Sequence, residues 1–128
     1  MPKKSRHSAK NKELRKCLPE FFKKHVERIL SGYERCLECG STLRGNISEV
    51  AHIAPKTSYK EIMCDDDNVI YLCGLYSANG CHHKFDNQSA SKVQEMNIFE
   101  ECRRRLSLLS DKGVIFGYKF IDKYKLDE

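Results

Sequence analysis

Residues 36–40 read Cys-Leu-Glu-Cys-Gly, and residues 73–82 read Cys-Gly-Leu-Tyr-Ser-Ala-Asn-Gly-Cys-His. A CxxC turn lets two thiolates reach one tetrahedral ion, and four such sulfurs make a closed structural zinc site. Cys73 and Cys81 can supply the second pair, although seven residues separate them, where a compact turn has about two. We therefore expect Cys36, Cys39, Cys73 and Cys81 to bind one structural Zn²⁺ ion.

The remaining cysteines are expected to have other roles. The chain has seven cysteines. The odd number, the abundant lysines and the lack of a signal-like apolar segment at the start favour a reducing, cytoplasmic setting over a disulfide scaffold. Cys64 is an alternative zinc ligand in place of Cys73 or Cys81, but it lies in a polar loop beside three aspartates. Cys17 and Cys102 lie on apolar helix faces, where we expect small buried hydrophobic residues.

The charge of the chain is unevenly distributed. Its 128 residues carry a formal net charge of +5 and suit one small domain. No apolar run approaches the roughly 20 residues that span a membrane, so we expect no membrane association. Ten Lys and Arg residues oppose three glutamates within residues 3–28. Such a surface gains affinity for DNA by counterion release, although a charge run is as often only a solvated helix face.

Hydrophobic periodicity predicts an α+β fold in three segments. Residues 1–32 read as a basic tail and a broken amphipathic helix, in which Pro19 begins the second part and Gly32 ends it. Residues 33–90 contain two β-prone runs, 47–53 and 69–73, joined by a polar loop and followed by a short helix over 81–87. This middle segment is the expected zinc-stabilised core.

The third segment, residues 91–128, is predicted to flank that core with a helix and a strand. Ser91 to Gln94 form a capping-box pattern, and the apolar positions that follow it continue at helical spacing to about Leu109. After a turn, residues 114–121 read as a strand with Phe116, Tyr118 and Phe120 on one side.

Three polar residues mark the strand, strand and helix of the middle segment. The first is His52, which ends the predicted strand in the run Glu49-Val50-Ala51-His52-Ile53-Ala54-Pro55. The second is Asn68, which opens the run Asn68-Val69-Ile70-Tyr71-Leu72-Cys73. The third is His82, in the run Cys81-His82-His83-Lys84-Phe85-Asp86. Together with the CxxC pair, this order of motifs over about residues 36–86 resembles the HNH nuclease family, in its zinc-knuckle, restriction-type branch.

The resemblance implies a ββα-metal fold, a structural zinc ion and an endonuclease that hydrolyses the phosphodiester bonds of DNA. By the same resemblance, His52 is the general base, Asn68 is its positioning residue, and His82 binds a catalytic Mg²⁺ or Mn²⁺ ion. The chemistry suits these residue types, because hydrolysis needs a proton acceptor for water and a cation that neutralises charge on the phosphoryl oxygens. A neutral histidine near pH 7 supplies the first.

The chain departs from the common family pattern at Ala51, where an acidic residue would help bind the catalytic metal. Glu49 lies on the same strand face as Ala51, and Asp86 lies one helical turn after His82, so either carboxylate could complete the metal site. The acidic run 65–67 offers further carboxylates, although such a loop is more often a solvated turn.

The adjacent histidines 82 and 83 compete for the catalytic metal. Neighbouring helical residues point about 100° apart, so only one of them can face the hairpin. In an alternative register, His82 replaces Cys81 at the zinc and His83 binds the catalytic metal. His7 and His25 have no comparable neighbours, and we expect both at the surface.

Two other functions fit the same residues. A non-catalytic, zinc-stabilised DNA-binding module would keep the cysteines and the basic surface while its HNH site has decayed, as Ala51 suggests. A zinc-stabilised interaction subunit would use the amphipathic helix from Ser91 to bind a protein. One chain is also compatible with action as a homodimer or together with an accessory subunit.

Overall fold

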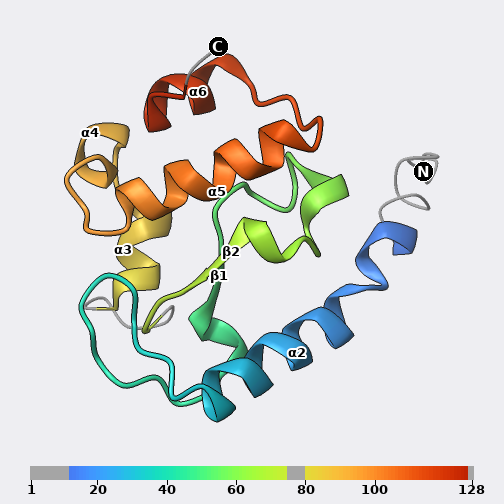
Figure 1. Cartoon of the computed structure of the whole chain (residues 1–128), viewed down its shortest axis with the longest axis vertical. Coiled ribbons are helices and arrows are strands. Elements are labelled where there is room, and N and C mark those ends of the chain that lie inside the picture. The colour runs from blue at the N-terminus through green and yellow to red at the C-terminus, as the bar shows by residue number, and fades with distance from the viewer. Residues whose placement is uncertain (1–11, 75–79, 127–128) are drawn as a thin grey trace, which may run out of the picture.

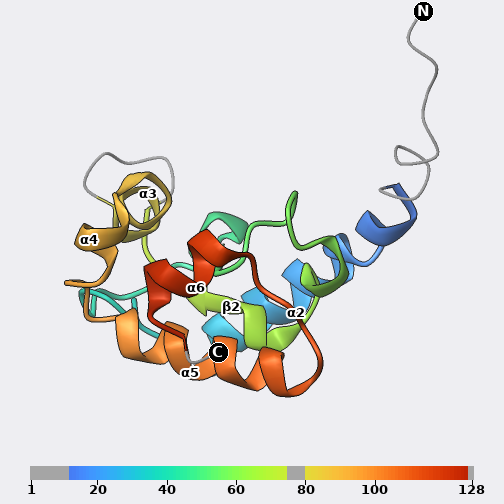
Figure 2. The same ribbon diagram turned by 90° about the horizontal axis from the view of Figure 1, so that it is seen from above.

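The computed structural model describes residues 12–74 and 80–126, which form an α+β fold around a small antiparallel hairpin. Strand β1 (Val50–His52) pairs with strand β2 (Val69–Tyr71). Helices α2 (Leu18–Ser31) and α5 (Phe99–Asp111) lie on either side of this hairpin (Figure 1). The shorter helices are α3 (Cys81–Asn87), α4 (Ala90–Val93) and α6 (Tyr118–Tyr124). Helices α3 and α4 lie together at one end of the molecule in both views (Figure 1, Figure 2).

The expected break in the first helix is confirmed. Residues 12–15 are helical, a turn follows, and α2 then begins with Pro19 in its first turn and ends at Gly32. Cys17 lies at this break. It is exposed and forms a disulfide with Cys64, so the expectation of a buried, unpaired Cys17 is wrong. The turn at residues 16 and 17 interrupts the helix, so the Cys17 side chain does not lie on the buried apolar face.

The hairpin is shorter than the sequence indicates, whereas the helix after it has the expected bounds. Residues 47–49 form a single 3₁₀ turn instead of the start of β1. The turn forms because the Glu49 carboxylate accepts hydrogen bonds from the backbone N–H groups of Arg44, Gly45 and Asn46, which curls the chain. Helix α3 covers Cys81–Asn87, as predicted.

The single helix predicted from Ser91 is two helices, α4 and α5, separated by residues 94–98. The Glu38 carboxylate explains where α5 begins. It accepts hydrogen bonds from the backbone N–H groups of Asn97 and Ile98, at 3.0 and 2.9 Å. A carboxylate at a helix N-terminus satisfies free amides and complements the helix dipole. Glu38 lies inside the CxxC turn, so the cysteine pair is attached directly to α5.

The strand predicted over residues 114–121 is absent, and helix α6 occupies the second half of that segment. Phe116, Phe120 and Tyr124 are spaced by four residues, and their rings pack in succession, with centroids 5.3 and 4.9 Å apart. Tyr118, which a strand would place beside Phe116 and Phe120, is 79% exposed. The aromatic spacing therefore follows the helical period and not the strand period.

All three sequence segments contribute to one hydrophobic core. Its buried members include Phe21 and Ile29 of α2, Leu72 beside the hairpin, and Leu106 and Tyr124 near the C-terminus. Cys102 is fully buried in the same core, as expected. Among the described residues, no helix is both long and apolar enough to cross a membrane.

Candidate functional site

Four cysteines meet beside the hairpin, as the sequence predicts. The Sγ atoms of Cys36, Cys39, Cys73 and Cys81 all lie within 4.8 Å of one another, and those of Cys39 and Cys73 are 3.7 Å apart. Zinc–sulfur bonds of about 2.3 Å in a tetrahedron place the sulfurs about 3.8 Å apart. The cluster can therefore hold a metal such as zinc. Cys64, the alternative ligand, is in the disulfide and does not join it.

The first cysteine pair forms a tight turn. The Gly40 N–H donates to the Cys36 carbonyl at 2.9 Å, and the Cys36 N–H donates to the Ser41 carbonyl at 2.9 Å. Burial raises the pKa of the Cys36 and Cys81 thiols. Hydrogen bonding to Ser41 instead lowers the pKa of Cys39 to about 6. A metal ion must therefore displace protons from the buried thiols, and its binding becomes weaker at low pH.

The long interval between Cys73 and Cys81 closes through two glycines. A Cβ atom on Gly80 would lie 1.8 Å from the Gly74 carbonyl oxygen. The two backbone segments therefore lie so close together that position 80 has no room for a side chain. The His82 N–H also donates to the Cys73 carbonyl at 2.9 Å. These contacts bring the two cysteines together despite their separation in the sequence.

We expect Gly80→Ala to disrupt the cysteine cluster. The added Cβ would overlap the Gly74 backbone, which cannot move without displacing Cys73. The cost should exceed the roughly 1–3 kcal/mol that is typical of overpacking. Metal analysis of the purified variant should find less zinc per chain than in the wild type. Gly117→Ala is the matched control, because its Cβ would lie 3.4 Å from the nearest atom, an ordinary contact. Full zinc content in Gly80→Ala would contradict this account.

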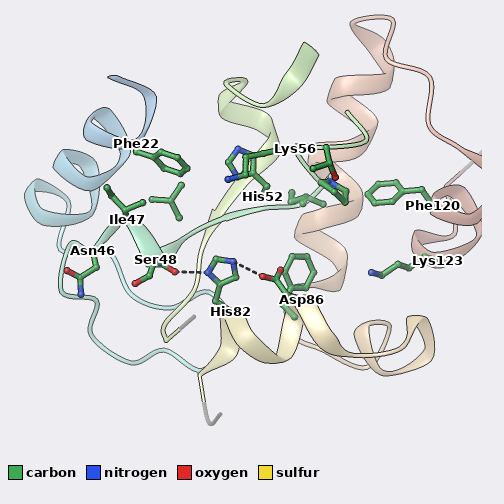
Figure 3. Close-up of a pocket in the computed structure, with 15 residues that line it drawn as sticks. Phe22, Asn46, Ile47, Ser48, His52, Lys56, His82, Asp86, Phe120 and Lys123 are labelled. Carbon is green, nitrogen blue, oxygen red and sulfur yellow. Dashed lines mark hydrogen bonds and ion pairs between the residues drawn. The ribbon is translucent and has the colours of Figure 1, made fainter. Parts of the chain in front are cut away.

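A cavity of about 1070 Å³ lies between β1 and α3. Its lining includes His52 from β1 and both His82 and Asp86 from α3, so the hairpin and the following helix face each other across it (Figure 3). Lys56 and Lys123 also line the cavity. Two imidazoles, one carboxylate and two ammonium groups thus share one concave surface.

One nitrogen of His52 is fixed by a backbone carbonyl, and the other has no hydrogen-bond partner among residues 12–74 and 80–126. The Nε2 atom lies 2.6 Å from the Met63 carbonyl oxygen, which can only accept, so Nε2 carries the proton. The Nδ1 atom therefore keeps its lone pair. Burial lowers the pKa of His52 to about 4, so the ring is neutral at pH 7. A neutral imidazole with an available Nδ1 can accept a proton.

Asn68 holds the loop that follows β1. Its side chain is fully buried and hydrogen-bonds to backbone groups: Oδ1 accepts from the Ala54 N–H at 2.8 Å, and Nδ2 donates to the carbonyls of Ala54 and Ile62. The next residue, Met63, carries the carbonyl that orients His52. Asn68 therefore contacts the loop that carries this carbonyl and makes no hydrogen bond to His52 itself.

His82 has a similar arrangement with the nitrogens exchanged. Its Nδ1–H donates to the Ser48 carbonyl at 2.6 Å, and its Nε2 lies 3.3 Å from Oδ2 of Asp86 (Figure 3). A lone pair on Nε2 and a carboxylate oxygen repel each other unless a proton or a metal ion lies between them. The pair is therefore a suitable donor set for a divalent cation.

The other acidic candidates lie elsewhere. Glu49 is buried and its carboxylate is occupied by backbone amides, outside the cavity lining. Asp65 and Asp67 form ion pairs with Lys112. Asp86 is therefore the carboxylate that the fold brings to His82. His83 is half-buried and does not line the cavity.

The structure corrects the expectation that His25 lies at the surface, and it places two lysines that no motif indicated, Lys56 and Lys123, in the cavity lining. His25 is 2% exposed, with Nδ1 2.6 Å from the Tyr71 hydroxyl and Nε2 2.9 Å from Asp66 Oδ1. Its position four residues from both Phe21 and Ile29 was a signal of burial. Lys123 could not be found in the same way, because no motif includes it and it lies just beyond the segment 114–121 that reads as a strand. His7 lies outside the described residues.

No protein-family model, curated protein or solved structure matches the chain. The resemblance to HNH nucleases therefore depends on the motif residues of the sequence.

Proposed function

We propose that the protein is a metal-dependent DNA endonuclease of the HNH type, with β1, β2 and α3 as its ββα-metal core. One observation carries the proposal: His52 and His82 line one cavity, each with one ring nitrogen hydrogen-bonded to a backbone carbonyl, and the second nitrogen of His82 lies 3.3 Å from the Asp86 carboxylate. Carbonyl acceptors that select a tautomer are typical of histidines used in catalysis and metal binding.

His52 is the proposed general base. Its free Nδ1 accepts a proton from the water that attacks the phosphorus atom, while the Met63 carbonyl keeps the ring oriented. Asn68 is a positioning residue, since it holds the loop that supplies this carbonyl. The lowered pKa keeps His52 in its proton-accepting form at neutral pH.

His82 and Asp86 would hold the catalytic Mg²⁺ or Mn²⁺ ion, with Asp86 in place of the acidic residue missing at Ala51. When bound, the ion supplies positive charge to the phosphoryl and leaving oxygens. The Cys36, Cys39, Cys73 and Cys81 site has no open ligand position and is assigned a structural role. Of the two lysines of α2, Lys23 is exposed and would contact the DNA backbone, whereas Lys24 forms an ion pair with Asp66 at 2.7 Å.

The test compares His82→Ala with His83→Ala in nicking of supercoiled plasmid by purified protein in Mg²⁺ or Mn²⁺. We expect His82→Ala to lower the affinity for the catalytic cation by about 10–100-fold or more, because the cation loses a ligand. The variant should then need a correspondingly higher metal concentration for nicking. His83→Ala removes the neighbouring imidazole, which does not line the cavity, and should nick like the wild type.

The opposite order of effects would instead support the register in which His83 binds the catalytic metal. Absence of nicking by zinc-loaded wild type in either metal would refute the nuclease. Salt-sensitive DNA binding in that case would identify the non-catalytic module.

A further inference from the structure

Helix α6 brings a lysine to the cavity that no motif indicates. Lys123 is half-buried and lines the cavity with Asp86 and Phe120. Figure 3 shows its side chain pointing from α6 toward Asp86, while Lys56 lies above Asp86 in this view, with its Nζ 5.5 Å from the centre of the Phe22 ring. The two lysines come from separate parts of the chain, the loop after β1 and the C-terminal helix.

Lys123 is held in this position by contacts on several sides. Its Nζ lies 5.4 Å from the centre of the Tyr124 ring and 6.0 Å from that of Phe85. Its carbonyl accepts from Gln94 Nε2 at 2.9 Å, and Arg103 Nε donates to the next carbonyl at 3.0 Å. The helix, and the lysine with it, is therefore fixed to α4 and α5.

The ammonium group has no ion-pair partner within 4 Å among residues 12–74 and 80–126. Burial lowers the pKa of Lys123, which shows that its charge is partly desolvated there. A partly buried cation without a carboxylate is costly unless an anion approaches it. Aromatic rings offset only a part of that cost.

The charges of the cavity favour an anion overall. Its lining contains two lysines and one carboxylate, Asp86. If Asp86 serves a divalent cation, both ammonium groups remain uncompensated. A DNA backbone that enters the cavity then meets two cations on a concave, partly apolar surface, where charge interactions are stronger than in open solvent.

We propose that Lys123, together with Lys56, binds the phosphate backbone of DNA in this cavity, which makes α6 part of the substrate-binding surface. The inference rests on the proposed function for its choice of substrate and deepens it by assigning the phosphate contacts. It concerns binding alone, so it can be tested without cleavage.

The test measures the affinity of purified, zinc-loaded protein for a fluorescein-labelled 20-base-pair DNA duplex by anisotropy at several salt concentrations, without added divalent cation. Lys123→Met keeps the apolar stem and removes the charge. We expect it to weaken binding by about 3–10-fold and to lower the slope of log affinity against log salt by about one. Lys123→Arg should restore both values.

Lys125→Met is the matched control, because this exposed lysine follows α6 and does not line the cavity. It should bind DNA like the wild type, and zinc content and melting temperature should confirm that each variant is folded. Equal affinity and salt slope for Lys123→Met and the wild type would overturn the inference, as would wild type that does not bind the duplex. Binding that depends on Lys123 without any nicking would retain the inference and remove the nuclease.

Discussion

Replacing His52 with alanine is expected to slow plasmid nicking by about 10²–10⁴-fold at saturating Mg²⁺ or Mn²⁺, the usual contribution of a general base. The variant loses the Nδ1 atom that is free to accept a proton, whereas His82 and Asp86 are unchanged. Metal affinity should therefore change little while the maximal rate falls. Initial rates measured over a series of metal concentrations separate the two quantities.

The same comparison needs a histidine variant outside the cavity, and His83→Ala serves as this control. Because the His52 ring lies 5.9 Å from that of Phe22, its loss also removes packing, so zinc content and melting temperature should be matched before rates are compared. Equal rates for His52→Ala and the wild type would eliminate His52 as the base. A loss that follows a raised metal requirement would point to an altered metal site instead.

We expect loss of the proposed zinc ion to unfold the protein, and Cys39→Ser is the most direct way to cause this loss. Cys39 is exposed, so serine removes a ligand with little loss of packing. Structural zinc contributes about 10–16 kcal/mol of apparent binding free energy, which equals or exceeds the roughly 5–15 kcal/mol net stability of a typical domain. The cluster also joins the end of the hairpin, α3 and, through Glu38, the start of α5.

Far-UV circular dichroism and thermal melting should show the loss in Cys39→Ser and in wild type treated with a chelator, with recovery of the wild type on adding zinc. Cys102→Ala is the control, because it changes a buried cysteine outside the cluster. A cooperative melt of Cys39→Ser within a few degrees of wild type would show that the hydrophobic core and the Cys17–Cys64 disulfide hold the fold without metal.

Local patterns predicted those elements in which residue type and spacing act within one segment. The break before α2 follows from Pro19, and the CxxC turn follows from Cys36 and Cys39. The bounds of α3 follow from the pattern of polar and apolar residues within Cys81–Asn87. The expected strand over 114–121 was wrong for the same kind of reason. Alternating aromatics suit a strand, yet Phe116, Phe120 and Tyr124 also fit the helical period, and packing against α4 and α5 selected the helix.

The sequence by itself determined the chemistry that is available: four thiols suited to zinc, and histidines suited to proton transfer and metal binding. Only the tertiary structure decided which groups meet. Backbone carbonyls of Met63 and Ser48 select the free nitrogen on each histidine, and Asp86 reaches His82 while Glu49 is held by amides. Lys123 enters the cavity because α6 docks there. Residue type sets reactivity locally, but the partner of each side chain depends on contacts between segments far apart in the chain.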